Sequence, residues 1–338
     1  MKKLISLICV LAMVLALAAC GSSAPAAATE APAASTEAPA EDVSADKTFV
    51  VGICQLVQHP ALDAATQGFK DALTEALGDK VTFQEQNASG DSATCSLICN
   101  QFVSDEVDLI MANATASIQA AASATNTIPI LGTSITDYGV ALGVDNWTGV
   151  SGTNISGTSD LAPLDGQAAM IQELVPDAKT IGLLYCSGEP NSIFQADSME
   201  ALLTDMGYSV ERYTFADSND VSSVTANACS NSDVLYIPTD NTAASCTEAI
   251  NNVALSAGIP IVAGEEGIAS GCGVATLSIS YYDLGRATGE MAAEILTEGA
   301  DISTMEVRFA PAFTKEYNAD ICEALNITVP EDYVAIAK

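Results

Sequence analysis

From Thr48 onward, short apolar runs alternate with stretches in which apolar residues recur every three or four positions. The first run, 49–54, has the pattern of a buried strand, and the next stretch that of a one-sided helix. Further strands are expected at 81–86, 108–112 and 128–131, with a helix at 115–124. This alternation is typical of βαβ units and predicts parallel sheets.

The second half of the chain repeats the motifs of the first half in the same order. Gly182 lies in a strand that resembles the one around Gly52. The segment 233–245 resembles 108–117, and 257–264 resembles 126–132. The fold class predicted is therefore α/β, with two similar doubly wound parallel-sheet lobes joined by a hinge.

The repeat also predicts where a ligand binds. Ligands of open parallel sheets lie beyond the carboxyl ends of the strands, and two lobes that face each other there form a cleft that closes about a hinge. The cleft loops are expected at 55–60, 87–91, 113–117 and 133–137 in the first lobe, and at 187–192, 216–220, 239–242 and 264–266 in the second. They supply the candidate ligand-binding residues Gln55, His59, Ala114, Thr115, Ser134, Thr136, Glu189, Asn191, Asp240, Asn241 and Glu265.

The N-terminus has the features of a targeting signal. Lys2 and Lys3 precede an apolar stretch at 4–17, which is too short for a typical membrane span. The small residues before Cys20 resemble a bacterial lipobox, in which the cysteine is acylated. We expect a signal peptide at 1–19 and lipidation of Cys20. The alternative is an ordinary cleaved signal peptide with an incidental cysteine.

A low-complexity segment follows, and with Cys20 it forms the region 20–47. It is rich in Ala, Pro, Thr, Ser and Glu and buries too little apolar surface to offset its ordering entropy. We expect a lipid-anchored tether, and no other long apolar run suggests a second membrane attachment.

Composition narrows the class of partner. The chain has 338 residues, with 11 Lys and Arg against 43 Asp and Glu, for a formal charge of −32. Such an excess of acid excludes nucleic acid and electrostatic docking on anionic membranes. Hydrophobic residues make up 49% of the chain, enough for a substantial core, and the length suggests two domains.

Several motifs carry a family resemblance. The segments 52–63, 112–120, 146–151, 185–192 and 239–245 resemble the ABC-transporter substrate-binding lipoproteins of the tryptophan/tyrosine/phenylalanine type. The resemblance implies a type I periplasmic-binding fold whose chain crosses between the lobes three times. It also implies an aromatic amino acid ligand, an ABC permease and ATPase as partners, and an anchored monomer on the extracytoplasmic face.

The domain boundaries expected for such a fold place 48–157 and about 281–305 in lobe 1. Lobe 2 would contain 158–280 and about 306–338.

The chemistry of the cleft loops restricts the ligand. No Lys or Arg lies in them, which disfavours phosphates and dicarboxylates and favours a neutral, zwitterionic or cationic ligand. A ligand carboxylate fits the helix start at 113–117, unless Thr115 merely caps that helix. A ligand ammonium needs a carboxylate, for which Asp240, Glu265 and Glu189 are candidates, although Asp240 would also serve as an N-cap.

Two further roles remain open from the sequence. The lone His59 either positions groups at the edge of the hinge or lies at the surface. An apolar slot for the ligand would use aromatic residues, and the candidates are Tyr138, Phe194, Tyr281 and Tyr282.

The cysteines indicate neither a metal nor a disulfide framework. Cys95 and Cys99 share a helix face with apolar residues and are expected to be buried as small hydrophobes. Cys246 and Cys272 are a candidate disulfide pair. No Cys-x-x-Cys is present and there is one His, so we predict no structural metal and no cofactor.

Enzymatic function is disfavoured. The chain lacks the Gly-x-Ser-x-Gly, P-loop and Gly-x-Gly-x-x-Gly motifs, and one His offers little for a hydrolase triad. We predict a binding protein rather than an enzyme. The alternatives are a nucleoside- or sugar-binding lipoprotein, or a ligand-sensing lipoprotein of the same fold.

Overall fold

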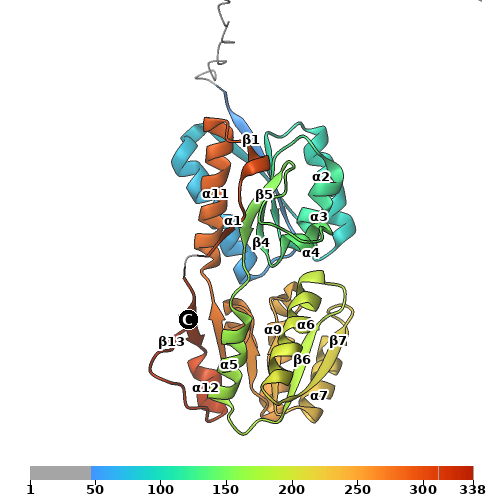
Figure 1. The fold of residues 1–338 in the computed structure, drawn as a ribbon, viewed down its shortest axis with the longest axis vertical. Coiled ribbons are helices and arrows are strands. Elements are labelled where there is room, and N and C mark those ends of the chain that lie inside the picture. The colour runs from blue at the N-terminus through green and yellow to red at the C-terminus, as the bar shows by residue number, and fades with distance from the viewer. Residues whose placement is uncertain (1–46, 311, 338) are drawn as a thin grey trace, which may run out of the picture. The chain divides into compact units, whose positions relative to one another are not determined.

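The computed structural model describes residues 47–310 and 312–337, all of which belong to one compact unit. They form two lobes, each with one sheet that is covered by helices on both faces (Figure 1). The prediction of two parallel-sheet α/β lobes is confirmed. The predicted signal peptide, Cys20 and nearly all of the tether lie outside the described residues.

Lobe 1 contains a six-stranded sheet with the order β11-β5-β4-β3-β1-β2. Its strands are β1 (Phe49–Gln55), β2 (Val81–Asn87), β3 (Leu109–Asn113), β4 (Ile130–Ile135), β5 (Ile155–Ser159) and β11 (Arg308–Phe309). Its helices are α1 (Pro60–Leu77), α2 (Ser92–Ser104), α3 (Thr115–Ala124), α4 (Tyr138–Leu142) and α11 (Tyr281–Glu298), with short 3₁₀ turns at Gly78–Lys80 and Ile302–Thr304.

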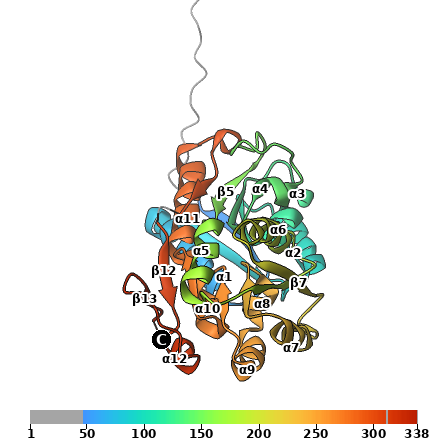
Figure 2. The ribbon, with the colours of Figure 1, turned by 60° about the horizontal axis from the view of Figure 1, so that its bottom comes forward.

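Lobe 2 contains a seven-stranded sheet with the order β13-β12-β10-β9-β8-β6-β7. Its strands are β6 (Thr180–Cys186), β7 (Ser209–Phe215), β8 (Val234–Ile237), β9 (Ile261–Ala263), β10 (Ala275–Ser278), β12 (Thr314–Tyr317) and β13 (Val334–Ala335). Its helices are α5 (Leu164–Leu174), α6 (Pro190–Asp205), α7 (Val221–Asn231), α8 (Asn241–Ser245), α9 (Thr247–Ala257), α10 (Glu266–Cys272) and α12 (Ala319–Ala324). Figure 2 shows α6 and α7 on opposite sides of β7.

The two sheets share one strand order. The sequence β2-β1-β3-β4-β5 in lobe 1 is repeated as β7-β6-β8-β9-β10 in lobe 2, and all of these pairs are parallel. The one antiparallel pair in the described residues joins β10 to β12. In each lobe the order reverses direction beside the first strand, which is where doubly wound sheets bind ligands.

The central strands are buried on both faces, as their continuous apolar runs predict. In β1, Val51 and Ile53 pack with the helices α1 and α11, whereas Cys54 packs with α2 and α3. In β6, Leu183 packs toward α5 and α6, whereas Leu184 packs toward α7 and α10. Each sheet therefore has two apolar layers.

The chain passes between the lobes three times, after β5, after β10 and after β11. Arg308 and Phe309 pair with Thr158 and Ser159 in the lobe 1 sheet. The last crossing therefore comes after residue 309, later than the boundary near 305 expected from the sequence.

Helices α1 and α11 lie side by side because glycines permit close backbone contact. A Cβ atom on Gly68 would lie 2.0 Å from the Tyr282 carbonyl oxygen, and one on Gly285 would lie 2.0 Å from the Ala65 carbonyl oxygen. This contact fixes the N-terminus of α1 against the N-terminus of α11. Both helix ends lie at the cleft.

The eight described cysteines are all free thiols. Cys95 and Cys99 are buried, as expected. The candidate Cys246–Cys272 disulfide is wrong, because Cys272 is buried at the end of α10 with its thiol on the Ile268 carbonyl, whereas Cys246 is partly exposed beside Ser245. Within the described ranges, no helix is long and apolar enough to cross a membrane.

We predict that Gly68→Ala destabilises the protein by about 1–3 kcal/mol, because the added methyl group forces α1 away from α11. The control is Gln67→Ala on the exposed neighbouring position, which loses only a side-chain contact with Asp71 and should change stability by a few tenths of a kcal/mol. Urea unfolding measures both. Equal stabilities for the two variants would contradict the close contact.

Candidate functional site

The predicted cleft loops of both lobes meet around a cavity of about 10 Å³. This is room for about one water molecule and lies well below the range for small-molecule sites, so the cavity must widen to hold a ligand. We call it the inner cavity, and the residues that line it are His59, Leu62, Ser134, Thr136, Asp160, Asn191, Thr239, Asp240, Asn241, Ala244, Glu265 and Tyr281. No Lys or Arg is among them.

A second, larger space between the lobes is partly open to solvent and has a volume of about 340 Å³. We call it the outer cavity. Its walls include apolar residues of both lobes, among them Leu56, Val57, Ala116 and Ala216. Asn241 lines both cavities, so the two spaces adjoin at this side chain.

The structure brings seven of the eleven predicted site residues to the inner cavity, namely His59, Ser134, Thr136, Asn191, Asp240, Asn241 and Glu265. Glu189 lines the outer cavity instead. Gln55, Ala114 and Thr115 line neither. Their roles as ligand contacts stay predictions.

Gln55 has a structural role within lobe 1. Its amide donates to Asp63 Oδ1 at 2.7 Å and to the Val57 carbonyl, and its oxygen accepts from Thr66 Oγ1. These bonds hold the 55–60 loop against α1 and leave Gln55 little capacity for a ligand.

The start of α3 contradicts the capping alternative for Thr115 and leaves its role as a ligand contact a prediction. The N-cap residue is Ala114, with φ 86° and ψ 162°, and no side chain caps the helix. This backbone conformation is costly for any residue except glycine and persists only where the surroundings enforce it. Thr115 is the first helical residue and is buried.

Asp160 is the most unusual group in the inner cavity. It lies on the first crossing, directly after β5, and its residue surface is 5% exposed. Its Oδ2 accepts a 2.9 Å hydrogen bond from the Tyr281 hydroxyl, whereas its Oδ1 has no partner. Burial raises the pKa of Asp160 to about 6, against the opposing effects of the Tyr281 and Thr136 hydroxyls.

Asp240 is also buried, but its carboxylate is fully used within lobe 2. Oδ1 accepts from the Ala243 amide as an N-cap of α8, and Oδ2 accepts from the Cys186 amide and the Ser192 hydroxyl at 2.6 and 2.7 Å. Burial and the nearby charge of Glu189 raise its pKa. The capping alternative is what the structure shows, so Asp240 has no free oxygen for an ammonium.

Glu265 and Glu189 bind helix starts in the same way. Glu265 accepts from the amides of Gly267 and Ile268 at the start of α10, and burial raises its pKa to about 7. Glu189 accepts from the backbone amides and side chains of Asn241 and Thr242. Of the carboxylates considered, only Asp160 retains an unused oxygen in the inner cavity.

Polar side chains join the lobes across the cleft. Thr136 of lobe 1 lies 3.3 Å from Thr239 of lobe 2 through their hydroxyl oxygens, and Gln195 donates to both. His59 Nε2 of lobe 1 lies 3.3 Å from Asn241 Oδ1 of lobe 2. A ligand can therefore reach the inner cavity only if the lobes separate.

Three buried polar atoms around the inner cavity lack a partner. In the described part of the chain, seven buried side-chain polar atoms make no hydrogen bond, and His59 Nδ1, Ser134 Oγ and Asp160 Oδ1 are among them. Ser134 also adopts a left-handed φ of 56°. Buried polar groups are normally paired, so their concentration at one cavity makes it the candidate binding site.

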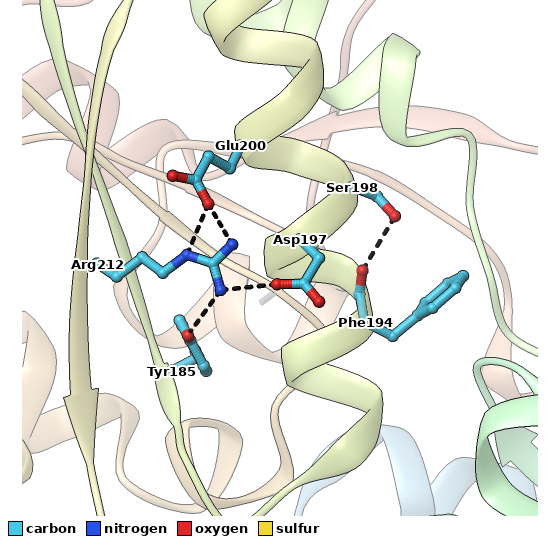
Figure 3. A network of polar contacts seen from close by, with 6 residues as sticks. All are labelled: Tyr185, Phe194, Asp197, Ser198, Glu200 and Arg212. Carbon is cyan, nitrogen blue, oxygen red and sulfur yellow. Dashed lines mark hydrogen bonds and ion pairs between the residues drawn. The ribbon is translucent and has the colours of Figure 1, made fainter. Parts of the chain in front are cut away.

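Helix α6 presents Asn191 and Gln195 to the cleft, and an ion-pair network holds it against the sheet. Figure 3 shows Arg212 of β7 between Asp197 and Glu200 of α6, with the Tyr185 hydroxyl of β6 beside it. The Arg212–Asp197 distance is 2.7 Å. This bridge fixes the orientation of α6 over β6 and β7.

The predicted aromatic slot is only partly present. Tyr281 lines the inner cavity. Tyr138 is buried in lobe 1, where its hydroxyl donates to the Gly132 carbonyl and its ring stacks on Trp147. Tyr282 donates to Asp71, and the ring of Phe194 points away from the Arg212 network (Figure 3). Neither Tyr282 nor Phe194 lines either cavity.

The sequence analysis missed Asp160 and placed Tyr281 only as a possible slot residue. Both follow the fifth strand of the repeat, β5 in lobe 1 and β10 in lobe 2. The repeat was matched at the first, third and fourth strands of each lobe, and the two crossings were left out of the cleft loops. Extending the match by one strand would have found both residues.

Comparisons with known proteins give a consistent family. The chain is 38% identical over 280 residues to a tyrosine-binding protein of Clostridioides difficile (strain R20291), covering 82% of this chain and 81% of that protein. A crystal structure of an ABC domain from Streptococcus pneumonia in complex with L-Trp is 32% identical, with a TM-score of 0.80, covering 84% and 97%.

A third relative is a ligand-free, open substrate-binding protein with adhesive properties from Clostridium difficile. It is 37% identical, with a TM-score of 0.66, covering 86% of this chain and 99% of that one. This chain therefore superposes more closely on the L-Trp complex than on the open structure.

The family model described as ABC transporter substrate binding protein matches residues 50–338. Proteins of this kind bind a solute outside the cytoplasm for an ABC transporter and are not enzymes. The chain belongs to the ABC transporter substrate-binding protein family.

Proposed function

We propose that the protein captures an aromatic amino acid between its two lobes and delivers it to an ABC importer. The observation that carries this proposal is the free Oδ1 of Asp160 in the inner cavity. A buried ionised carboxylate is costly unless it is paired. An amino acid supplies the missing charge through its ammonium, whereas a sugar or a nucleoside does not.

The lining of the two cavities also determines how the carboxylate of a zwitterionic ligand would be bound. No Lys or Arg lines the inner or outer cavity, so a ligand carboxylate must rely on backbone amides. The long helices α1, α3 and α6 each begin at the cleft edge of a sheet. Helix N-termini present free amides and favour negative charge.

Room for an aromatic ring is available in the outer cavity. It adjoins the inner cavity at Asn241, and Leu56, Val57 and Ala116 provide apolar wall in lobe 1. An amino acid whose ammonium binds Asp160 would extend its side chain in this direction. The ligands named for the tyrosine-binding relative and for the L-Trp complex agree with this proposal.

The proposal is tested with a panel of amino acids, nucleosides and sugars in thermal-shift and calorimetric titrations. We expect tyrosine, tryptophan or phenylalanine to give the largest shift, with about 2.7 kcal/mol of stabilisation at 100 times Kd. Asp160→Asn should weaken binding by about 30-fold to several thousand-fold, because loss of one partner of a desolvated charge pair costs about 2–5 kcal/mol.

The control for that experiment is Asp105→Asn, since Asp105 is exposed at the end of α2, lines neither cavity and accepts a hydrogen bond from the Gln101 side chain. Its affinity should stay within about twofold of the unmodified protein, in keeping with the small effect of an exposed charge. A sugar or nucleoside that shifts strongly while aromatic amino acids do nothing would refute the proposed ligand.

Affinity should also fall in acid. Asp160 has a raised pKa of about 6, so it is ionised at pH 7.5 and mostly protonated at pH 5. Only the ionised form attracts an ammonium, and proton binding competes with ligand binding. We expect the Kd of the aromatic amino acid to rise about tenfold from pH 7.5 to pH 5. Calorimetry across this range should show a smaller rise for Asp160→Asn, and identical profiles would exclude Asp160 as the titrating group.

We further propose that Cys20 carries the lipid that anchors the protein to the membrane, after removal of residues 1–19. The support is the lipobox-like sequence and the low-complexity tether that follows it. Cys20→Ala should release the protein or leave an uncleaved precursor, as fractionation and mass spectrometry would reveal. A processed Cys20→Ala protein that stays with the membrane would contradict the anchor.

A further inference from the structure

His59 lines the inner cavity, and its side chain has one nitrogen in a contact between lobes and the other without a partner. His59 is the N-cap residue of α1, followed by Pro60 at the first helical position, and its residue surface is 6% exposed. Nε2 lies 3.3 Å from Asn241 Oδ1, and Nδ1 has no partner. Which nitrogen carries the proton decides what the cavity offers a ligand.

The orientation of the Asn241 amide is determined by Glu189. The Asn241 side-chain nitrogen lies 2.7 Å from Glu189 Oε2, and the Asn241 backbone amide lies 2.9 Å from the same oxygen. An ionised carboxylate only accepts hydrogen bonds, so the NH₂ group of Asn241 must face Glu189. The carbonyl oxygen of Asn241 therefore faces His59.

Because this oxygen only accepts, His59 Nε2 must be the donor. Burial lowers the pKa of His59, against the opposing effects of Asn241, Glu189 and Asp63, so the ring is neutral at pH 7. A neutral imidazole with its proton on Nε2 has a lone pair on Nδ1. His59 Nδ1 is thus a buried acceptor at the inner cavity.

Three residues that line the inner cavity then carry such an unpartnered acceptor. Asp160 Oδ1 accepts as a carboxylate oxygen, Ser134 Oγ has two lone pairs, and His59 Nδ1 accepts through the tautomer that lobe 2 selects. A primary ammonium has three N–H donors. The number and the type of the unpartnered groups match it.

We propose that His59 is a specificity residue, whose Nδ1 accepts one hydrogen bond from a primary ammonium that Asp160 and Ser134 also bind. This inference rests on the proposed function and adds that the site distinguishes a primary amine from an N-alkylated one. His59 belongs to lobe 1 and Asn241 to lobe 2. Recognition by His59 is therefore complete only when the lobes have closed.

The first test compares L-tyrosine and L-tryptophan with their N-methyl derivatives and with the matching aryl propionic acids, which lack the amine. An N-methyl group removes one N–H and leaves one acceptor unpaired in a dry site. Sites built to hydrogen-bond a polar group reject analogues that lack it. We expect the N-methyl amino acids to bind at least tenfold more weakly, and the acids to bind more weakly still.

A matched pair of variants separates recognition from lobe contact. In His59→Gln the side-chain amide reaches the position of Nε2, so the contact with Asn241 is kept and the acceptor in the cavity is lost. In His59→Asn the amide oxygen reaches the position of Nδ1, so the acceptor is kept and the contact with Asn241 is lost.

We expect His59→Gln to lower the affinity for L-tyrosine or L-tryptophan about tenfold and to leave the affinity for the N-methyl derivative nearly unchanged. The preference for the primary amine over the N-methyl amine then disappears. His59→Asn should keep the preference. Equal weakening of both ligands by both variants would show that His59 is only a contact between lobes and would overturn the inference.

The single histidine allows a direct measurement. The chain contains one His, so nitrogen NMR of the untagged protein labelled at histidine gives one pair of ring signals. We expect a protonated Nε2 and a non-protonated Nδ1, with Nδ1 shifting when the amino acid binds. A proton on Nδ1, or an Nδ1 signal that ignores the ligand, would overturn the inference.

The outcomes also separate this inference from the proposed function. If the unmodified protein binds neither aromatic amino acid, both are wrong. If it binds them but does not distinguish the N-methyl derivatives, only the role assigned to His59 is wrong.

Discussion

A carboxylate buried without a counter-charge is the constraint on which the chemistry of this cleft depends. Asp160 is 5% exposed and has one oxygen bonded to Tyr281 and one without a partner. The other buried carboxylates, Asp240 and Glu265, are satisfied by backbone amides at helix starts and, for Asp240, also by the Cys186 amide at the end of β6. The buried negative charges of the cleft are therefore stabilised by hydrogen bonds except at Asp160. A ligand must supply a positive charge, and it must place that charge beside Asp160.

The place of Asp160 in the chain gives this charge a mechanical role. Asp160 and Tyr281 stand on two of the three crossings between the lobes, and each follows the fifth strand of its sheet. Tyr281 also begins α11, which is held tightly against α1 through Gly68 and Gly285. Since α1 begins beside His59, the polar groups at the hinge and those of lobe 1 are supported by one closely packed pair of helices.

The sequence was sufficient to predict the two-lobe fold and most of the cleft, because both follow from the repeat. Buried parallel strands leave continuous apolar runs, and their carboxyl ends lie where the runs stop, which placed His59, Ser134 and Asp240 at the cavity. Hydrogen-bond partners are not encoded in such a pattern. From the sequence, Asp240 and Gln55 were equally good candidates for ligand contacts, yet each makes its hydrogen bonds within its own lobe. Asp160 was not predicted as a site residue because β5, the strand that precedes it, was not predicted from the sequence.

The contacts between lobes explain why closure can depend on a ligand. Among the described residues, the polar contacts across the cleft are few and mostly uncharged, such as Thr136 with Thr239 and His59 with Asn241. Each such hydrogen bond adds only about 0.5–1.5 kcal/mol net. Against this modest gain, closure buries the charge of Asp160, which opposes it. A bound ammonium removes that cost, and a ligand shifts an equilibrium only by its difference in affinity for the two states. The unpaired carboxylate thus makes the closed state conditional on the ligand.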